Sequence, residues 1–411
     1  MDTLKVRDAK DVEEVVRAAV ASEQPLEVIG HGSKRAIGHP MATNALLDVS
    51  ALNAVSSYEP NELIITVQAG APLADVQSLI DAKNQQFAFE PMDTSVLLGT
   101  AGAGTIGGMI GAGLAGPRRI KAGGIRDHLL GAHAVSGFGD SFKTGGRVVK
   151  NVTGYDLCKL LTGSWGTLAV MTEVTLKVMP KPEAERTLLL RGLDDVTANK
   201  AMTAALGSPF DVSGAAHLPG SALRSGGGAL AGLASGQPVT LVRLEGISAS
   251  AAHRAVSLSQ TLSSFGAVDS LADDASAAIW SALRDVVPFA ANGALGAWPV
   301  WRIVCPPASG GALGQALSRA TGGDVIYDWG GGLIWAAVPP GADAQATLVR
   351  GQVEAIGGHA TLIRATEDVR RAVDVFQPQA AGLAALGERV RASFDPRSVL
   401  NRGRMMRGGA A

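Results

Sequence analysis

Cysteine, aromatic residues and net charge are all scarce in this chain of 411 residues. Cys158 and Cys305 are its only cysteines, so the sequence offers no disulfide framework, zinc-ligand spacing or iron–sulfur ligand set, and we expect no metal site. The formal net charge of −1 gives no indication of a nucleic-acid partner. The first ten residues, MDTLKVRDAK, contain no apolar signal core, and we therefore expect a protein of the cytoplasm, where thiols stay reduced.

One segment of the chain also contains no charged residues. No charged side chain occurs from Thr94 to Pro117, and eight of these twenty-four residues are glycine. The stretch is long enough for a membrane-spanning helix, and Gly107 and Gly111 have G-x-x-x-G spacing. Each glycine, however, costs a helix about 1 kcal/mol relative to alanine. We therefore expect no transmembrane segment.

Three other interpretations of this glycine-rich segment remain. Residues 102–107 read G-x-G-x-x-G, the spacing of a dinucleotide-binding fingerprint, with Asp127 twenty residues later. We expect only a weak strand at 95–100 before it, and Pro117 stops any long helix after it. A loop and short helix that cradle a polyanionic ligand fit better, because glycine lets backbone N–H groups converge on phosphate oxygens. A flexible linker is the last alternative, but linkers lack the Ile, Met and Leu found here.

The length and the hydrophobic fraction of 46% allow two or three domains. Apolar periodicity in the first part of the chain is typical of α/β units, with helices expected at 11–22 and 72–83 and strands at 26–29, 63–69, 87–89 and 168–178. Thr153 and Asp156 have capping-box spacing before a short helix that Gly163 should end.

After Pro180-Lys-Pro182 the chain becomes rich in Ala, Gly and Ser, and we expect a domain boundary there. The later patterns follow the order β-α-β-β-α-β of the ferredoxin-like split βαβ motif. Its expected elements are strands 300–305 and 360–364, helices 312–320 and 344–356, and a hairpin around Trp329. A strand at 239–245 and a helix at 249–265 should extend the same antiparallel sheet, and a terminal helix with its tail should occupy 381–404.

Four segments resemble the PCMH-type FAD-binding domain of the vanillyl-alcohol-oxidase flavoprotein superfamily: PLEVIGHGSKRAIG (25–38), TIGGMIGAGLAGPRR (105–119), GIRDHLLG (124–131) and KNVTGYDLCKLLTGSWGTLAVMTEVTLKV (150–178). Within the superfamily, nearly the whole chain is similar to the FAD-binding subunits of bacterial glycolate oxidase. The resemblance implies an α+β fold with a two-subdomain FAD-binding domain at 1–180. It also implies an α+β cap domain with a ferredoxin-like antiparallel sheet at 181–375, and a C-terminal helix and tail at 376–411 that return to the FAD-binding domain.

The resemblance also implies which residues hold FAD. A first pyrophosphate loop is matched by Gly30, His31, Gly32, Ser33 and Lys34. A second flavin-binding segment is matched by Pro91, Thr105, Gly107, Gly108, Gly113, Gly116 and Pro117. Further matches are Arg126, Asp127, Glu173, Val174 and Asn401, the last in a turn where Arg402 replaces the proline of many relatives. Some relatives bind FAD covalently through a histidine that corresponds to Ser33, so we expect non-covalent FAD.

The implied activity is the oxidation of a small 2-hydroxy acid, glycolate to glyoxylate, with FAD as the hydride acceptor. The implied partners are a second flavoprotein subunit and an iron–sulfur subunit, which would receive the electrons and hold the protein peripherally at the inner face of the membrane. The sequence does not reveal a catalytic base. Arg302, Arg364 and Trp301 are candidates for holding a carboxylate, although arginine in a strand is commonly solvated. A self-sufficient FAD-dependent 2-hydroxyacid dehydrogenase and a structural subunit without catalysis remain alternatives.

Overall fold

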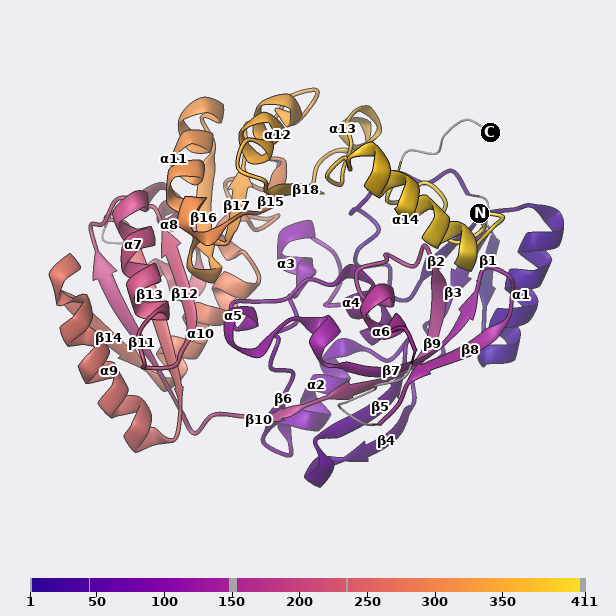
Figure 1. Ribbon diagram of the computed structural model, residues 1–411, viewed down its shortest axis with the longest axis horizontal. Helices are drawn as coiled ribbons and strands as arrows, with labels where there is room; N and C mark the ends of the chain where they lie inside the picture. The colour runs from indigo at the N-terminus through magenta and orange to yellow at the C-terminus, as the bar shows by residue number, and fades with distance from the viewer. Residues whose placement is uncertain (1, 44, 148–153, 234–235, 407–411) are drawn as a thin grey trace.

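The computed structural model describes residues 2–43, 45–147, 154–233 and 236–406. They form two lobes, with residues 2–180 toward the right and lower centre of Figure 1 and residues 184–364 at the left, while the last two helices lie at the upper right. Thr153 of the predicted capping box lies outside the described residues. In the described ranges no helix has both the length and the apolar character needed to cross a membrane.

The first lobe contains two main sheets. A parallel sheet has the order β1 (Asp2–Lys5), β3 (Ala45–Asp48), β2 (Leu26–Ile29). An antiparallel sheet has the order β4 (Val55–Glu59), β5 (Ile64–Gln68), β9 (Ala169–Lys177), β7 (Leu129–Ser136), β8 (Ser141–Gly145). The strands β6 (Gln85–Gln86) and β10 (Met179–Pro180) form a separate pair. The helices are α1 (Ala9–Ser22), α2 (Leu73–Asp81), α3 (Thr94–Leu98), α4 (Ile106–Ala112), α5 (Arg119–Ala122) and α6 (Leu157–Leu161). The predicted strands at 26–29, 63–69 and 168–178 are thus confirmed to within a residue or two.

The glycine-rich segment is a packed part of this lobe. Ile106, Met109 and Ile110 of α4 are buried in one hydrophobic cluster with residues of the antiparallel sheet, which a flexible linker would not be. The predicted weak strand at 95–100 is wrong, because the Asp93 carboxylate accepts a hydrogen bond from Ser95 N and caps α3 there. The predicted strand at 87–89 is also wrong, since pairing with β10 stops at Gln86.

The second lobe contains one antiparallel sheet of eight strands, in the order β14-β11-β13-β12-β16-β17-β15-β18. Its strands are β11 (Ala184–Arg191), β12 (Val212–Leu218), β13 (Val239–Gly246), β14 (Val268–Ala272), β15 (Val300–Val304), β16 (Asp324–Asp328), β17 (Leu333–Ala337) and β18 (His359–Arg364). Its helices are α7 (Asp195–Leu206), α8 (Gly220–Ser225), α9 (Ser248–Leu262), α10 (Asp273–Arg284), α11 (Gly310–Thr321) and α12 (Ala346–Glu354).

The ferredoxin-like motif predicted for the second half occurs twice. Strands β15 to β18, with α11 and α12 between them, have the spatial order β18-β15-β17-β16, which is the predicted split βαβ arrangement. Strands β11 to β14, with α7 and α9, repeat the same order. The two halves join where β12 pairs with β16, at His217 and Tyr327.

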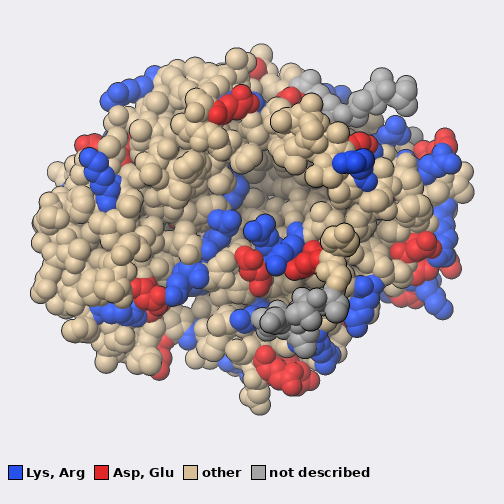
Figure 2. Space-filling view, viewed as in Figure 1, with Lys and Arg blue, Asp and Glu red and all other residues tan. Residues whose placement is uncertain are grey.

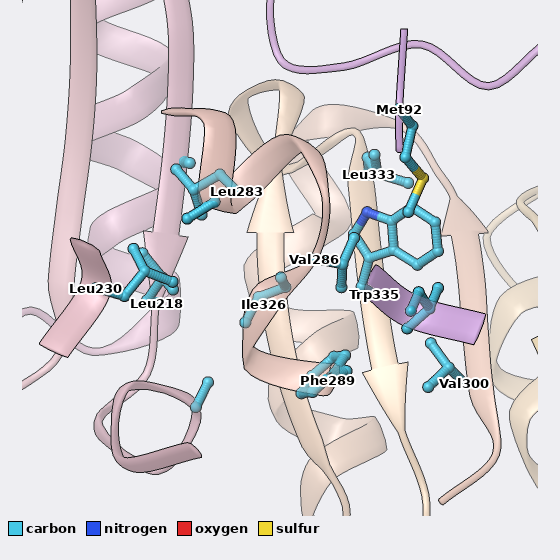
Figure 3. Close-up of a cluster of buried hydrophobic side chains, with 14 of the residues drawn as sticks. Met92, Leu218, Leu230, Leu283, Val286, Phe289, Val300, Ile326, Leu333 and Trp335 are labelled. Carbon is cyan, nitrogen blue, oxygen red and sulfur yellow. The ribbon is translucent and has the colours of Figure 1, made fainter. Parts of the chain in front are cut away.

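The two faces of this sheet have different environments. On β15, Trp301 and Ile303 lie in a hydrophobic cluster with residues of α11 and α12. Val300 belongs to the cluster on the other face, which also includes Met92 of the first lobe. Figure 3 shows Met92 against the Trp335 indole in this cluster. Because side chains alternate along a strand, Arg302 lies on the face that meets the first lobe.

After the sheet, α13 (Glu367–Ala372) and α14 (Ala381–Phe394) run back across the first lobe (Figure 1). Leu400 then forms a parallel bridge with Leu26 of β2. The Asn401 side chain accepts a hydrogen bond from Val28 N at 2.7 Å and donates one to Trp165 O at 2.7 Å. The C-terminal segment is therefore attached to the edge of the parallel sheet.

Candidate functional site

A cavity in the first lobe lies between the end of β2, helix α4, the start of β9 and the C-terminal turn. Nine of the residues predicted to hold FAD line this one cavity: Gly30, His31, Gly32, Ser33, Lys34, Thr105, Gly107, Gly108 and Asn401. Segments more than 350 residues apart in the chain thus meet around a single space, which the sequence order alone does not show.

The loop after β2 gives the cavity the character of an anion site. Gly32 has φ +68°, and no backbone N–H from His31 to Lys34 donates a hydrogen bond to another described residue. Lys34 Nζ lies 3.0 Å from Ala103 O, and burial lowers the pKa of this ammonium group to about 8. Consecutive free N–H groups beside a cation suit the oxygens of a phosphate or diphosphate.

Arg404 adds a second cation to this cavity. Its guanidinium lies over the Trp165 ring at 5.5 Å from the centroid and donates from Nη2 to Lys34 O at 2.6 Å. Its buried Nε has no hydrogen-bond partner among the described residues. Burial lowers the pKa of Arg404 to about 10. An anionic ligand would supply the missing acceptor, so these residues fit the diphosphate of FAD.

Two positions of α4 require glycine for different structural reasons. A Cβ on Gly107 would lie 2.9 Å from both Cβ and O of Ala69, so only glycine allows α4 to approach the end of β5. A Cβ on Gly111 would have Gly166 N as its nearest neighbour, at 4.0 Å, and Gly111 lines the cavity. Gly111 therefore keeps space free in the cavity.

The other predicted residues lie outside the lining of this cavity. Pro91 and Ala115 form a β-bridge, and Gly113 ends α4 with φ +66°. Gly116 and Pro117 continue toward the second lobe, where Gly116 O accepts a hydrogen bond from Trp329 Nε1 at 3.1 Å. The remaining four are Arg126 and Asp127 in a 3₁₀ turn and Glu173 and Val174 on β9, with the Val174 side chain in the hydrophobic core.

Sequence reasoning missed several residues that line the cavity. Trp165, Gly166, Ala169, Val170 and Met171 lie in the fourth segment that resembles the superfamily, where only Glu173 and Val174 were assigned to the cofactor. The signal that could have found them is the S-W-G-T-L turn at 164–168, which leads directly into β9.

A second group of polar side chains lies where the two lobes meet. Figure 2 shows Lys and Arg side chains gathered in the hollow between the lobes. Two guanidiniums, those of Arg119 on α5 and Arg302 on β15, lie over the Trp329 ring at 4.4 and 5.1 Å from its centroid. Of the three candidates for holding a carboxylate, Arg302, Arg364 and Trp301, only Arg302 lies over this ring.

Arg364 and Trp301 have structural contacts instead. The Arg364 guanidinium donates hydrogen bonds to four backbone carbonyls, among them Leu97 O at 2.9 Å and Trp298 O at 2.9 Å. Trp301 is fully buried on the helix-covered face of the sheet. Neither is free to hold a substrate.

Asp328, at the end of β16, is a buried carboxyl beside this group. Its Oδ1 accepts a hydrogen bond from Trp329 N at 2.7 Å. Burial, and to a smaller extent the negative charge of Glu90, raises the pKa of Asp328 to about 7. A carboxyl that titrates near neutral pH can accept a proton from a reacting hydroxyl. Its sequence neighbourhood gives no signal of this, because the pKa depends on burial in the folded protein.

A buried ion-pair network lies next to Asp328 and connects the lobes. Arg243 of β13 binds both carboxylate oxygens of Glu90 at 2.8 and 3.0 Å, and Arg118 binds both of Glu245 at 3.0 and 2.7 Å. Although burial disfavours its charge, the Arg243 and Arg118 guanidiniums hold the pKa of Glu90 below its usual value. In the described part of the chain, no group of three or more His, Cys, Asp or Glu residues is placed to hold a metal ion.

Comparisons with known proteins match two separate parts of the chain. Residues 3–145 match a family described as FAD binding domain, and residues 197–318 match FAD linked oxidases, C-terminal domain. Glycolate oxidase subunit GlcE of Escherichia coli is 30% identical over 396 residues, which are 95% of this chain and 95% of that protein. Glycolate oxidase subunit GlcD of Bacillus subtilis is 30% identical over 184 residues, 44% of this chain and 38% of that protein.

Solved structures show the same fold at low sequence identity. A p-cresol methylhydroxylase structure has a TM-score of 0.70 at 13% identity and covers 99% of this chain and 88% of its own. An alkyldihydroxyacetonephosphate synthase structure has a TM-score of 0.68 at 15% identity, with 97% and 76% covered. The predicted α+β, PCMH-type fold is therefore confirmed.

Proposed function

Because this chain belongs to the family of glycolate oxidase subunit GlcE and is an FAD-dependent oxidoreductase, we propose that it is the FAD-binding subunit of a complex that oxidises glycolate to glyoxylate. Its proposed partners are a second flavoprotein subunit and an iron–sulfur subunit, in the cytoplasm or held by them at the inner face of the membrane. The proposed domains are 1–180, 181–375 and 376–411.

The cavity of the first lobe carries this proposal. We assign the diphosphate of non-covalent FAD to the N–H groups of 31–34, Lys34 and the unpartnered Nε of Arg404. Asn401 ties the C-terminal turn to Val28 and Trp165, which closes one side of the cavity. Pro91, Gly113, Gly116 and Pro117 lead from this cavity toward the other lobe, and we propose that they follow the rest of the cofactor.

When bound, FAD supplies the hydride acceptor for the oxidation of a 2-hydroxy acid. The chain's own residues position the substrate and hold its proton. We assign the role of proton acceptor to Asp328, because burial raises the pKa of its carboxyl to about 7. Asp328 is 6% exposed, and its neighbour Trp329 belongs to the hydrophobic cluster that includes Met92, so little water reaches this carboxyl.

Purification of the full chain, alone and with its two proposed partner subunits, tests this function. We expect a flavin absorption spectrum from the chain alone, flavin released by acid without proteolysis, and glycolate-dependent bleaching in the complex. A chain that bleaches with glycolate without partners would instead be a self-sufficient dehydrogenase. A chain without flavin under every condition would refute the proposal.

A substitution at Gly111 tests the assignment of the cavity to FAD. In Gly111→Asp, the carboxylate would enter the cavity and repel the diphosphate, so we expect at least tenfold lower flavin content in a protein with unchanged circular dichroism. Gly341→Asp, at an exposed glycine with no atom near its Cβ position, is the matched control. Equal flavin content in the two variants would show that FAD does not lie against α4.

A further inference from the structure

Lys34 is a buried ammonium group whose hydrogen-bond partners are neutral. The residue lines the cavity of the first lobe and is 9% exposed. Its Nζ donates to Ala103 O at 3.0 Å and to Ser33 Oγ at 3.2 Å, and it forms no ion pair with any residue that the structure describes. Burial of a cation disfavours its charged form unless a counter-charge lies beside it. Lys34 therefore loses its proton more easily than a lysine in water.

The contacts of Lys34 also join two loops of the cavity. Ala103 belongs to the glycine-rich segment, and Thr100 Oγ1 of the same loop donates to Ser33 O at 3.3 Å. Gly104 has φ +90°, and a Cβ on it would lie 2.3 Å from Ser33 Oγ and 3.2 Å from Lys34 Nζ. Glycine at this position thus leaves room for the ammonium group between the two loops.

The cations near Lys34 give the cavity an excess of positive charge. Arg404 of the C-terminal turn donates to Lys34 O at 2.6 Å, and its own Nε has no partner in the described part of the chain. Arg35, the next residue, forms an ion pair with Glu27 of β2 at 2.6 Å, so its charge is already balanced. Lys34 and Arg404 are the two cations of the lining whose charge stays uncompensated among the described residues.

Asp93 is the carboxylate that acts on Lys34 from the neighbouring helix. It caps α3 and favours the charged form of Lys34, but the two form no ion pair within the described ranges. The segment 94–117 contains no charged residue, and His31 of the lining offers no negative charge. Burial, opposed in part by Asp93, lowers the pKa of Lys34 to about 8.

We propose that binding of FAD to this cavity takes up a proton at Lys34, so that the protein retains FAD less well as the solution becomes alkaline. The inference rests on the proposed function, in which the FAD diphosphate lies against the loop at 31–34. The diphosphate supplies the counter-charge that the cavity lacks, and an anion beside an ammonium group favours its charged form. A ligand that prefers the protonated protein must lose affinity where the free protein has lost that proton.

The sign of the effect follows from the state of Lys34 in the free protein. Well below pH 8 Lys34 already carries its proton, so FAD binding takes up none and the affinity does not depend on this group. Above pH 8 the free protein has lost the proton and FAD binding must restore it. Each further pH unit should then lower the affinity by up to about tenfold.

Calorimetric titration of the full chain, freed of flavin, with FAD at pH 7.5 and pH 9.5 tests this linkage. The affinity should fall about 20-fold between the two pH values. Titrations at pH 9.5 in two buffers of different ionisation enthalpy should show the uptake of about one proton per FAD. A residue that only holds Ala103 in place would change the affinity but would not take up a proton.

Two substitutions of Lys34 isolate its proton. Lys34→Arg keeps a cation that stays charged over this pH range, so it should bind FAD with no proton uptake at this position. Lys34→Met has no charge and should bind FAD at least tenfold more weakly than the natural protein at pH 7.5. Titration of the flavin itself or of Arg404 occurs in every variant, so the difference from Lys34→Arg measures Lys34 alone.

Lys200→Met, at an exposed lysine of α7, is the matched control and should keep the 20-fold pH dependence of the natural protein. Equal FAD affinity at the two pH values in the natural protein, or the same proton uptake in Lys34→Arg and Lys34→Met, would overturn the linkage while FAD binding stands. A chain that binds no FAD at either pH would refute the proposed function, and this inference with it.

Discussion

Asp328 shows how much one residue depends on its surroundings. Its pKa of about 7 in the folded protein compares with 3.8 for a free aspartate, so the folded state retains a proton that the unfolded chain releases. Stability must therefore fall as pH rises from about 4 to about 7, because the unfolded state binds fewer protons there.

Asp328→Asn removes this pH dependence while its amide oxygen can still accept the hydrogen bond from Trp329 N. We expect the free energy of unfolding of the natural protein to decline by about 3 kcal/mol relative to the variant between pH 5 and pH 8. Urea unfolding at both pH values measures this difference. Asp324→Asn, at the other end of β16, controls for an amide on the same strand. Parallel pH curves for the natural protein and Asp328→Asn would contradict the prediction.

At the scale of elements, the C-terminal turn is attached to β2 by few contacts. Asn401 accepts from Val28 N and donates to Trp165 O, and Asp395 accepts from Val399 N at 3.0 Å and Leu400 N at 2.8 Å. Asn401→Ala would leave the Val28 N–H without its acceptor, so we expect a loss of about 1–3 kcal/mol in the free energy of unfolding. We also expect weaker flavin retention, because Asn401 lines the cavity.

Chemical denaturation and the flavin content after gel filtration test both effects. Arg402→Ala, at the exposed neighbouring position, is the matched control and should behave like the natural protein. If Asn401→Ala retained flavin and stability to the same degree as Arg402→Ala, the turn would not be part of the cofactor site.

At the scale of the whole molecule, the two lobes are joined by a hydrophobic cluster and by the buried pairs Glu90–Arg243 and Arg118–Glu245. Glu90→Gln would remove the bidentate partner of the buried Arg243 and leave it only the 3.5 Å ion pair between its Nε and Glu245, so we expect a loss of up to about 3–5 kcal/mol in the free energy of unfolding. The double variant Glu90→Leu/Arg243→Met, which removes both charges, should recover most of this loss.

Urea unfolding of the single and double variants measures the coupling between the lobes. Glu388→Gln breaks an ion pair on the exposed helix α14 and should cost no more than about 1 kcal/mol. A single-variant loss as small as that of Glu388→Gln would mean that the pair does not hold the lobes together.

The sequence predicted most elements because their signals are local. The strand at 26–29, the alternation over 168–178 and the β-α-β-β-α-β order after residue 300 each follow from apolar period and turn residues. Its failures, at 87–89 and 95–100, occur where a side-chain cap or the end of strand pairing decided the local structure. The first ferredoxin-like repeat was only partly recognised, since β12 is buried along its whole length and β11 has four consecutive buried residues, so neither strand alternates strictly.

The sequence by itself determined the family, the cofactor and nine of the residues around the cavity. It could do so because the glycine-rich loops and the motif at 150–178 are continuous stretches of sequence. The tertiary structure alone decided which candidates act together. It paired Arg118 and Arg243 with carboxylates, used Arg364 to bind carbonyls, and placed Arg119 and Arg302 over Trp329 with no ion pair among the described residues. The physical reason is that desolvation and charge pairing depend on which distant residues meet when the two lobes close, and no local pattern encodes that.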